Sequence, residues 1–131
     1  MPKFTLMLVI FGEAFRNAVS LFFIRDIIGI PTIGAAYFFY FMELMEKNAI
    51  EMGLNKEDAH LLTIETALGA AKMALLSSYE PTTLRKQVSS PGGTTEQALN
   101  IFIQGKLDKL VRSAMDAAKR RSVELSESFK D

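Results

Sequence analysis

The sequence predicts an all-α fold, a bundle of helices over residues 31–131 that follows an apolar leader over residues 1–30. Two observations predict it. From residue 35 onward, apolar side chains recur at helical spacing, and the breaks in this pattern coincide with residues that begin or end helices. At 131 residues one domain is expected, and a single core could bury enough surface to be stable. The structure of the leader is left unassigned.

Composition excludes several classes of site. The chain has 15 basic and 15 acidic residues, so its formal net charge is zero and there is no electrostatic case for a nucleic-acid partner. It has no cysteine and one histidine. These counts exclude disulfides, a thiolate nucleophile and the usual structural zinc sites, so no metal centre is expected.

The first third of the chain is unusually apolar. Residues 1–42 hold eight of the ten phenylalanines and five charged side chains, so a partner subunit, a missing domain or a bilayer should cover them. The longest uncharged run, residues 27–42, contains Pro31 and is shorter than the roughly 20 apolar residues of a spanning helix. No secretory cleavage pattern is present. We therefore expect a cytoplasmic chain without a membrane span.

The first clear helix follows a predicted break. Residues 12–23 are only weakly helical, and residues 29–34 should interrupt the chain, because Pro31 cannot continue a helix and the glycines permit positive φ. A long helix is predicted over residues 35–52, with Gly53 as its C-cap. Its first two turns are apolar all round, which indicates burial on every side.

The second long helix is predicted to begin after Asn55, an N-cap followed by acidic residues, and to run to about Ser77. Gly69 lies inside it, where glycine costs about 1 kcal/mol relative to alanine. Either another backbone approaches closely at Gly69, or this is a tolerated surface glycine.

Three shorter signals predict the remaining helices. A proline at the first position favours a short helix over residues 81–88. Thr94 and Gln97 fit a capping box that opens the next helix, which should end near Gly105. The last helix is expected from Lys106 to about residue 126.

The loop over residues 89–95 is the strongest candidate site. Two consecutive glycines can expose backbone N–H groups, hydroxyl side chains surround them, and the positive end of a helix dipole points at the loop. This chemistry suits a carboxylate or a phosphate. The same residues also build an ordinary capped turn, and both interpretations stand.

Other polar candidates favour structural roles. Glu43 and Glu46 lie three residues apart and could flank a cation, but without a partnering histidine they are more typical of a solvated edge. His60 sits beside charged residues at a helix edge. The cluster over residues 119–121 is offset by neighbouring acidic residues and suits the C-terminal half of its helix.

Four segments, taken together and in order, resemble the C-terminal domain of pyrroline-5-carboxylate reductase. The resemblance covers the chain from about residue 34 to 131, and its most specific parts are S-P-G-G-T-T with L-G-A-A-K-M upstream. The matching segments are residues 36–43, 52–54, 68–73 and 88–95.

The resemblance implies a helical dimerisation domain that interlocks with a second subunit, giving a homodimer or a higher homo-oligomer. In the complete enzyme this domain follows a Rossmann domain that binds NADPH or NADH, and 1-pyrroline-5-carboxylate is reduced to L-proline in the last step of proline biosynthesis. Carried over by position, the residues that bind the substrate carboxylate are Ser90, Gly92, Gly93, Thr94 and Thr95, and Thr95 is the strongest side-chain candidate. Catalysis is mostly positioning, so no catalytic residue is assigned.

Two departures from the family limit what this chain is expected to do. The family motif S-G-S-G-P-A-Y is replaced over residues 31–37, where only Gly34, Ala36 and Tyr37 agree. No dinucleotide-binding fingerprint is present. We therefore expect no cofactor and no turnover for this chain alone, with a dinucleotide-binding domain supplied by another chain. The alternative is a catalytically silent module that retains only assembly.

Overall fold

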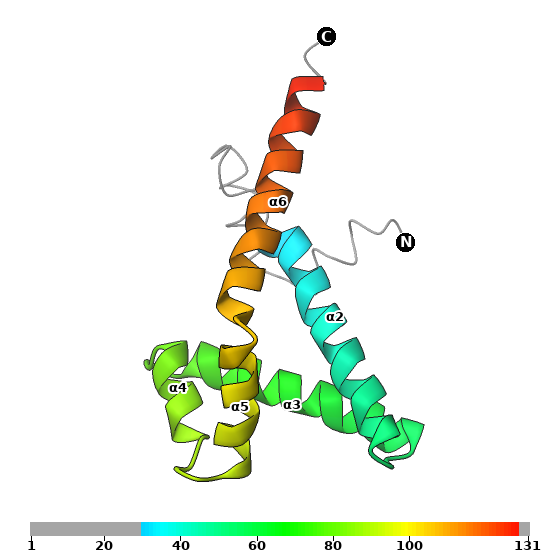
Figure 1. Ribbon diagram of the computed structural model, residues 1–131, viewed down its shortest axis with the longest axis vertical. Coiled ribbons are helices and arrows are strands. Elements are labelled where there is room, and N and C mark those ends of the chain that lie inside the picture. Colours follow the sequence, from blue (N-terminus) through cyan, green and yellow to red (C-terminus); the bar gives the residue numbers. More distant parts are fainter. Residues whose placement is uncertain (1–29, 129–131) are drawn as a thin grey trace. The chain divides into compact units, whose positions relative to one another are not determined.

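The computed structural model describes residues 30–128, and every element in that range is a helix (Figure 1). The all-α prediction is confirmed. The described residues belong to two units, one of residues 38–109 and one that includes residues 30–37 and 110–128. The predicted weak helix at residues 12–23 lies outside the described residues. The helices are α2 (Ile30–Glu51), α3 (Lys56–Leu76), α4 (Pro81–Gln87), α5 (Thr94–Gln104) and α6 (Leu107–Ser128).

Helix α2 begins earlier than predicted. The expected break over residues 29–34 is wrong from Ile30 onward, because α2 starts there and continues through Gly34. Pro31 falls in the first turn, where a backbone N–H would have no partner inside the helix in any case. A proline therefore does not stop a helix at this position.

The end of α2 is a Schellman motif, as the predicted C-cap at Gly53 requires. The N–H of Leu54 donates to the carbonyl of Ala49 at 3.1 Å, and the N–H of Gly53 donates to that of Ile50 at 2.9 Å. Gly53 has φ +109°, a conformation that strains any residue with a Cβ. The prediction is confirmed, and the motif turns the chain directly into α3.

Helix α3 has the predicted N-cap. The side-chain oxygen of Asn55 accepts a hydrogen bond from the N–H of Asp58 at 2.9 Å. A Cβ added at Gly69 would meet no atom within 4 Å, so the described residues make no close approach there. With respect to residues 30–128, Gly69 is therefore a surface glycine.

The junction between α5 and α6 differs from the prediction by one residue. The last helix begins at Leu107, because Lys106 has φ 55° and lies in the left-handed region. Gly105 has an ordinary φ of −71° and closes α5 through a bond from its N–H to the carbonyl of Ile101. The strained position thus falls on a lysine instead of the adjacent glycine.

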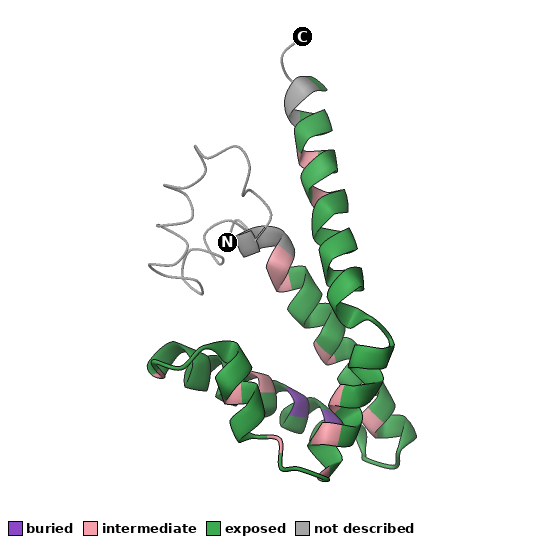
Figure 2. Cartoon of the chain, turned by 60° about the vertical axis from the view of Figure 1, so that its left-hand side comes forward, coloured by how far each residue is buried: buried purple, intermediate pink, exposed green. Residues whose placement is uncertain are grey.

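The described chain has almost no core of its own. Only Ala59 and Thr63 are buried among the described residues, and both lie on α3 (Figure 2). By contrast, Phe38 is 70% and Phe39 66% exposed on α2. Apolar surface on this scale is typical of a protein that associates with a partner.

Among the described helices, α3 is the one that is long and apolar enough to cross a bilayer. Its mean hydropathy is 1.2 over 18 residues. Length and composition are weak evidence, since core helices of soluble proteins pass the same test. Its first turn carries Glu57 and Asp58. The length and hydropathy of α3 alone therefore do not indicate a membrane span.

Candidate functional site

The candidate loop between α4 and α5 contains a tight turn over residues 90–93. The N–H of Gly93 donates to the carbonyl of Ser90 at 2.9 Å, and Gly92 has φ +72°. Proline at the second position and a positive-φ glycine at the third are the signature of a type II turn. A Cβ on Gly93 would lie 3.0 Å from the Ser90 oxygen. The φ of Gly92 therefore favours glycine, whereas a side chain at Gly93 would require the Ser90 carbonyl to shift by a few tenths of an ångström.

A carboxylate holds this turn against the start of α5. Oε2 of Glu96 accepts a hydrogen bond from the N–H of Gly92 at 2.7 Å. The N-cap is Gly93, which has no side chain to close a cap. The predicted Thr94–Gln97 capping box is therefore wrong: the helix begins one residue earlier than that box requires, and Glu96 occupies the third helical position.

Sequence reasoning missed Glu96, although a signal was available. A glutamate three residues after an N-cap commonly reaches back to the backbone before the helix. Glu96 stands three residues after Gly93. The bond differs from that of a capping box in one respect: Glu96 accepts from the N–H of Gly92, one residue before the N-cap, because the N–H of Gly93 is bonded to the Ser90 carbonyl.

The five predicted carboxylate-binding residues lie together in this turn and the first turn of α5. Among the described residues, the N–H groups of Thr94, Thr95 and Glu96 have no hydrogen-bond acceptor, as expected for the start of a helix. The hydroxyl of Ser89 is not free for a ligand, because it donates a hydrogen bond to the carbonyl of Arg85 in α4 at 2.7 Å. Thr94 and Thr95 are exposed. The loop thus presents open N–H donors beside exposed hydroxyls, the chemistry that receives an anion.

The charges around the loop have both signs. Arg85 and Lys86 lie in the last turn of α4, where positive charge suits the helix dipole. Neither makes an ion pair with another residue of the described range. Glu96 is the acidic residue in the first turn of α5, so the approach to the loop is not uniformly positive.

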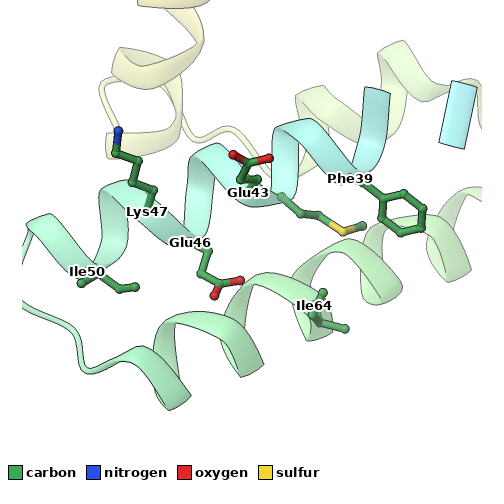
Figure 3. Close-up of a pocket in the computed structure, with 7 residues that line it drawn as sticks. Phe39, Glu43, Glu46, Lys47, Ile50 and Ile64 are labelled. Carbon is green, nitrogen blue, oxygen red and sulfur yellow. The ribbon is translucent and has the colours of Figure 1, made fainter. Parts of the chain in front are cut away.

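A second feature is an open groove along α2 and α3 (Figure 3). Glu46 points toward α3 in this view, and its carboxylate lies 3.0 Å from Nδ1 of His60. Within residues 30–128 no group of three or more histidine, cysteine, aspartate or glutamate side chains comes together that could hold a metal ion. The lining residues are Phe39, Met42, Glu43, Glu46, Lys47, Ile50 and Ile64.

Comparison with known proteins identifies the domain. Residues 23–125 match the family model for pyrroline-5-carboxylate reductase dimerisation. The geometry defines a class of protein: a helical domain with exposed apolar helices and a glycine-rich loop at the start of a helix. The chain belongs to the pyrroline-5-carboxylate reductase family, and it carries the family's dimerisation domain.

Curated relatives support the same assignment. A pyrroline-5-carboxylate reductase of Pseudomonas aeruginosa is 49% identical over 96 residues, which cover 73% of this chain and 35% of the relative. One from Vibrio alginolyticus is 43% identical over 107 residues, which cover 81% of this chain and 39% of the relative. The chain thus spans little more than a third of the length of these relatives.

Solved structures agree in fold. A pyrroline-5-carboxylate reductase from Coxiella burnetii matches with a TM-score of 0.74 at 45% identity, over 78% of this chain and 38% of that one. The NADP-bound pyrroline carboxylate reductase of Plasmodium falciparum matches with a TM-score of 0.72 at 26% identity, over 76% of this chain and 39% of that one.

Proposed function

We propose that this chain is the dimerisation and substrate-carboxylate-binding part of a pyrroline-5-carboxylate reductase. The activity would be NAD(P)H-dependent reduction of 1-pyrroline-5-carboxylate to L-proline, in the cytoplasm. The observation that carries the proposal is the loop over residues 89–95, where open N–H groups at the start of α5 lie beside exposed hydroxyls in a family member. Within the whole reaction, this chain would bind and orient the substrate.

The cofactor does not fit the described part of this chain. A dinucleotide site needs a strand, a glycine-rich turn and a helix that receives the pyrophosphate, and residues 30–128 contain helices alone. The nicotinamide, which would supply the hydride, therefore belongs to a domain outside these helices. We expect the 131-residue chain to show no turnover by itself.

Oligomerisation would allow the substrate and the cofactor to be bound by different chains. A dimerisation domain implies a homo-oligomer, and the exposed aromatic residues of α2 provide the apolar surface for it. We propose a homodimer or larger ring in which the loop of one subunit meets a dinucleotide-binding domain on another chain. The helices would then fix the distance between imine and nicotinamide, the contribution that positioning makes to catalysis.

Titration of the chain with L-proline, followed by NMR, tests the binding function. Proline carries the carboxylate and the ring of the substrate, so we expect saturable shifts at the loop, and Thr95→Ala should weaken binding about tenfold by removing a hydroxyl that bonds a charged group. Thr83→Ala, an exposed threonine in α4, is the matched control. If proline leaves the loop resonances unchanged at millimolar concentration, the carboxylate-binding role is wrong.

A catalytically silent oligomerisation module is the second candidate. The replacement of the family motif over residues 31–37 favours it. The two serines of the motif are absent, and its proline is replaced by Ala35. This candidate predicts assembly without proline binding. NADPH oxidation by the purified chain with 1-pyrroline-5-carboxylate would contradict both candidates, because the first places the cofactor on another chain and the second has no activity.

A further inference from the structure

The hydrogen bond between Glu96 and Gly92 connects two parts of the loop that are otherwise joined only through a glycine. The turn over residues 90–93 closes on itself through the Ser90 carbonyl and the Gly93 N–H. The bond to Glu96 ties this turn to α5, in addition to the first helical bond, from the N–H of Gln97 to the carbonyl of Gly93. A carboxylate that accepts an N–H bond at 2.7 Å is a strong, charge-assisted acceptor.

This bond also divides the N–H groups of the loop into two sets. Those of Gly92 and Gly93 are used internally, by Glu96 and by the Ser90 carbonyl. Those of Thr94 and Thr95 have no acceptor in the described range. A substrate carboxylate that arrives at the loop therefore meets the second set first.

We propose that Glu96 is a positioning residue: by holding Gly92, it orients the turn so that the substrate carboxylate is received by the N–H groups of Thr94 and Thr95. The inference rests on the proposed carboxylate-binding function. Glu96 is half-buried while Thr95 and Gln97 beside it are exposed, which agrees with a side chain folded back onto the loop. Pre-forming the turn lowers the cost of ordering it on binding.

Charge and positioning predict opposite effects at this residue, which makes the proposal testable. A negative charge beside an anion site opposes binding, so removing it would strengthen binding if charge were the whole role. If Glu96 positions the turn, Glu96→Ala weakens proline binding despite the lost charge. Glu96→Gln keeps an acceptor for Gly92 and should bind proline at least as well as the unaltered chain.

The experiment measures the full chain by NMR, first without ligand and then with L-proline. Without ligand, Glu96→Ala should speed hydrogen exchange at the Gly92 amide about tenfold, while Glu96→Gln leaves it close to the original rate. With proline, Glu96→Ala should weaken binding about fivefold. Glu57→Ala removes a glutamate from the first turn of α3 that makes no hydrogen bond within the described residues, and serves as the matched control.

The outcomes distinguish the positioning role of Glu96 from the carboxylate-binding function of the loop. Proline binding by the unaltered chain, with equal or tighter binding by Glu96→Ala, overturns the positioning role and leaves the carboxylate-binding function standing. No proline binding by the unaltered chain overturns both. Weaker binding by Glu96→Ala with rescue by Glu96→Gln supports both, since a role in charge alone predicts tighter binding for either substitution.

Discussion

Nδ1 of His60 lies 3.0 Å from Oε2 of Glu46, and this contact joins α3 to α2 between residues 14 positions apart in sequence. The side chain of Glu46 is 24% exposed, whereas that of His60 is 63% exposed. Solvent therefore competes for the histidine, and an exposed pair of this kind contributes little to stability. The structure bears out a helix-edge position for His60, and adds a partner from the neighbouring helix.

The His60–Glu46 contact should have a small measurable energy. We expect His60→Ala to lower the free energy of unfolding by no more than about 0.5 kcal/mol. A double-mutant cycle with Glu46→Ala, by urea denaturation at one protomer concentration, isolates the pair. A coupling energy above about 1.5 kcal/mol would mean that solvent screens the pair less than its exposure implies.

Removing the N-cap of α3 should have a larger effect. Asn55→Ala loses the hydrogen bond from Asp58 N–H to the Asn55 side chain, and we expect the free energy of unfolding to fall by about 1 kcal/mol. Asn100→Ala, at an exposed position inside α5, is the control and should change it far less. Equal effects of the two substitutions in urea denaturation would show that the cap does not stabilise α3.

Relieving the strained backbone at Lys106 should stabilise the chain. A left-handed conformation costs a residue with a Cβ about 1 kcal/mol that glycine does not incur, and Lys106 has φ 55°. We therefore expect Lys106→Gly to raise the free energy of unfolding by up to about 1 kcal/mol.

The control for Lys106→Gly is a second lysine in ordinary helical conformation. Lys109→Gly, inside α6, should lower the free energy of unfolding by about 1 kcal/mol, since glycine is a poor helix former. Thermal unfolding of both variants at one concentration checks the opposite signs. Destabilisation by Lys106→Gly as well would contradict the strain at this residue.

Assembly should depend on the exposed aromatic residues of α2. Phe39 is 66% exposed in the single chain, and a buried phenylalanine contributes roughly 1.5–3 kcal/mol relative to an exposed one. Phe39→Glu would also bury a charge, so we expect at least a tenfold weaker dimer in sedimentation velocity. Thr82→Glu, in α4, adds the same charge outside α2 as a control. A stable monomer for the unaltered chain at micromolar concentration would overturn the interface.

The elements best predicted from sequence are those whose cause is local. Asn55 and Gly53 have the capping roles that the sequence predicts, because an N-cap bond and a Schellman motif involve only nearby residues. The errors have local causes too. Pro31 predicts a break but fits the first turn of α2, and the positive φ falls on Lys106 instead of Gly105.

The candidate site was also only partly predictable from the sequence. The glycines of the loop and its threonines identify an anion-binding sequence, but two possible glutamate or glutamine partners stand side by side in it. Glu96 is selected because the helix begins after Gly93, which places this side chain within 2.7 Å of the Gly92 nitrogen. A shift of one residue at the start of the helix changes which side chain reaches back.

The sequence by itself determined the helical class of this protein, the N-cap of α3, the end of α2, and the family motifs of the loop, because these depend on bonds within one or two turns of chain. Only the tertiary structure decided that His60 meets Glu46, and that the ring centroids of Phe41 and Phe102 lie 5.9 Å apart. Such contacts depend on how separate helices approach one another, a quantity that local periodicity does not encode. The tertiary structure also decided that the aromatic residues of α2 face outward in the single chain, where a second subunit can bury them.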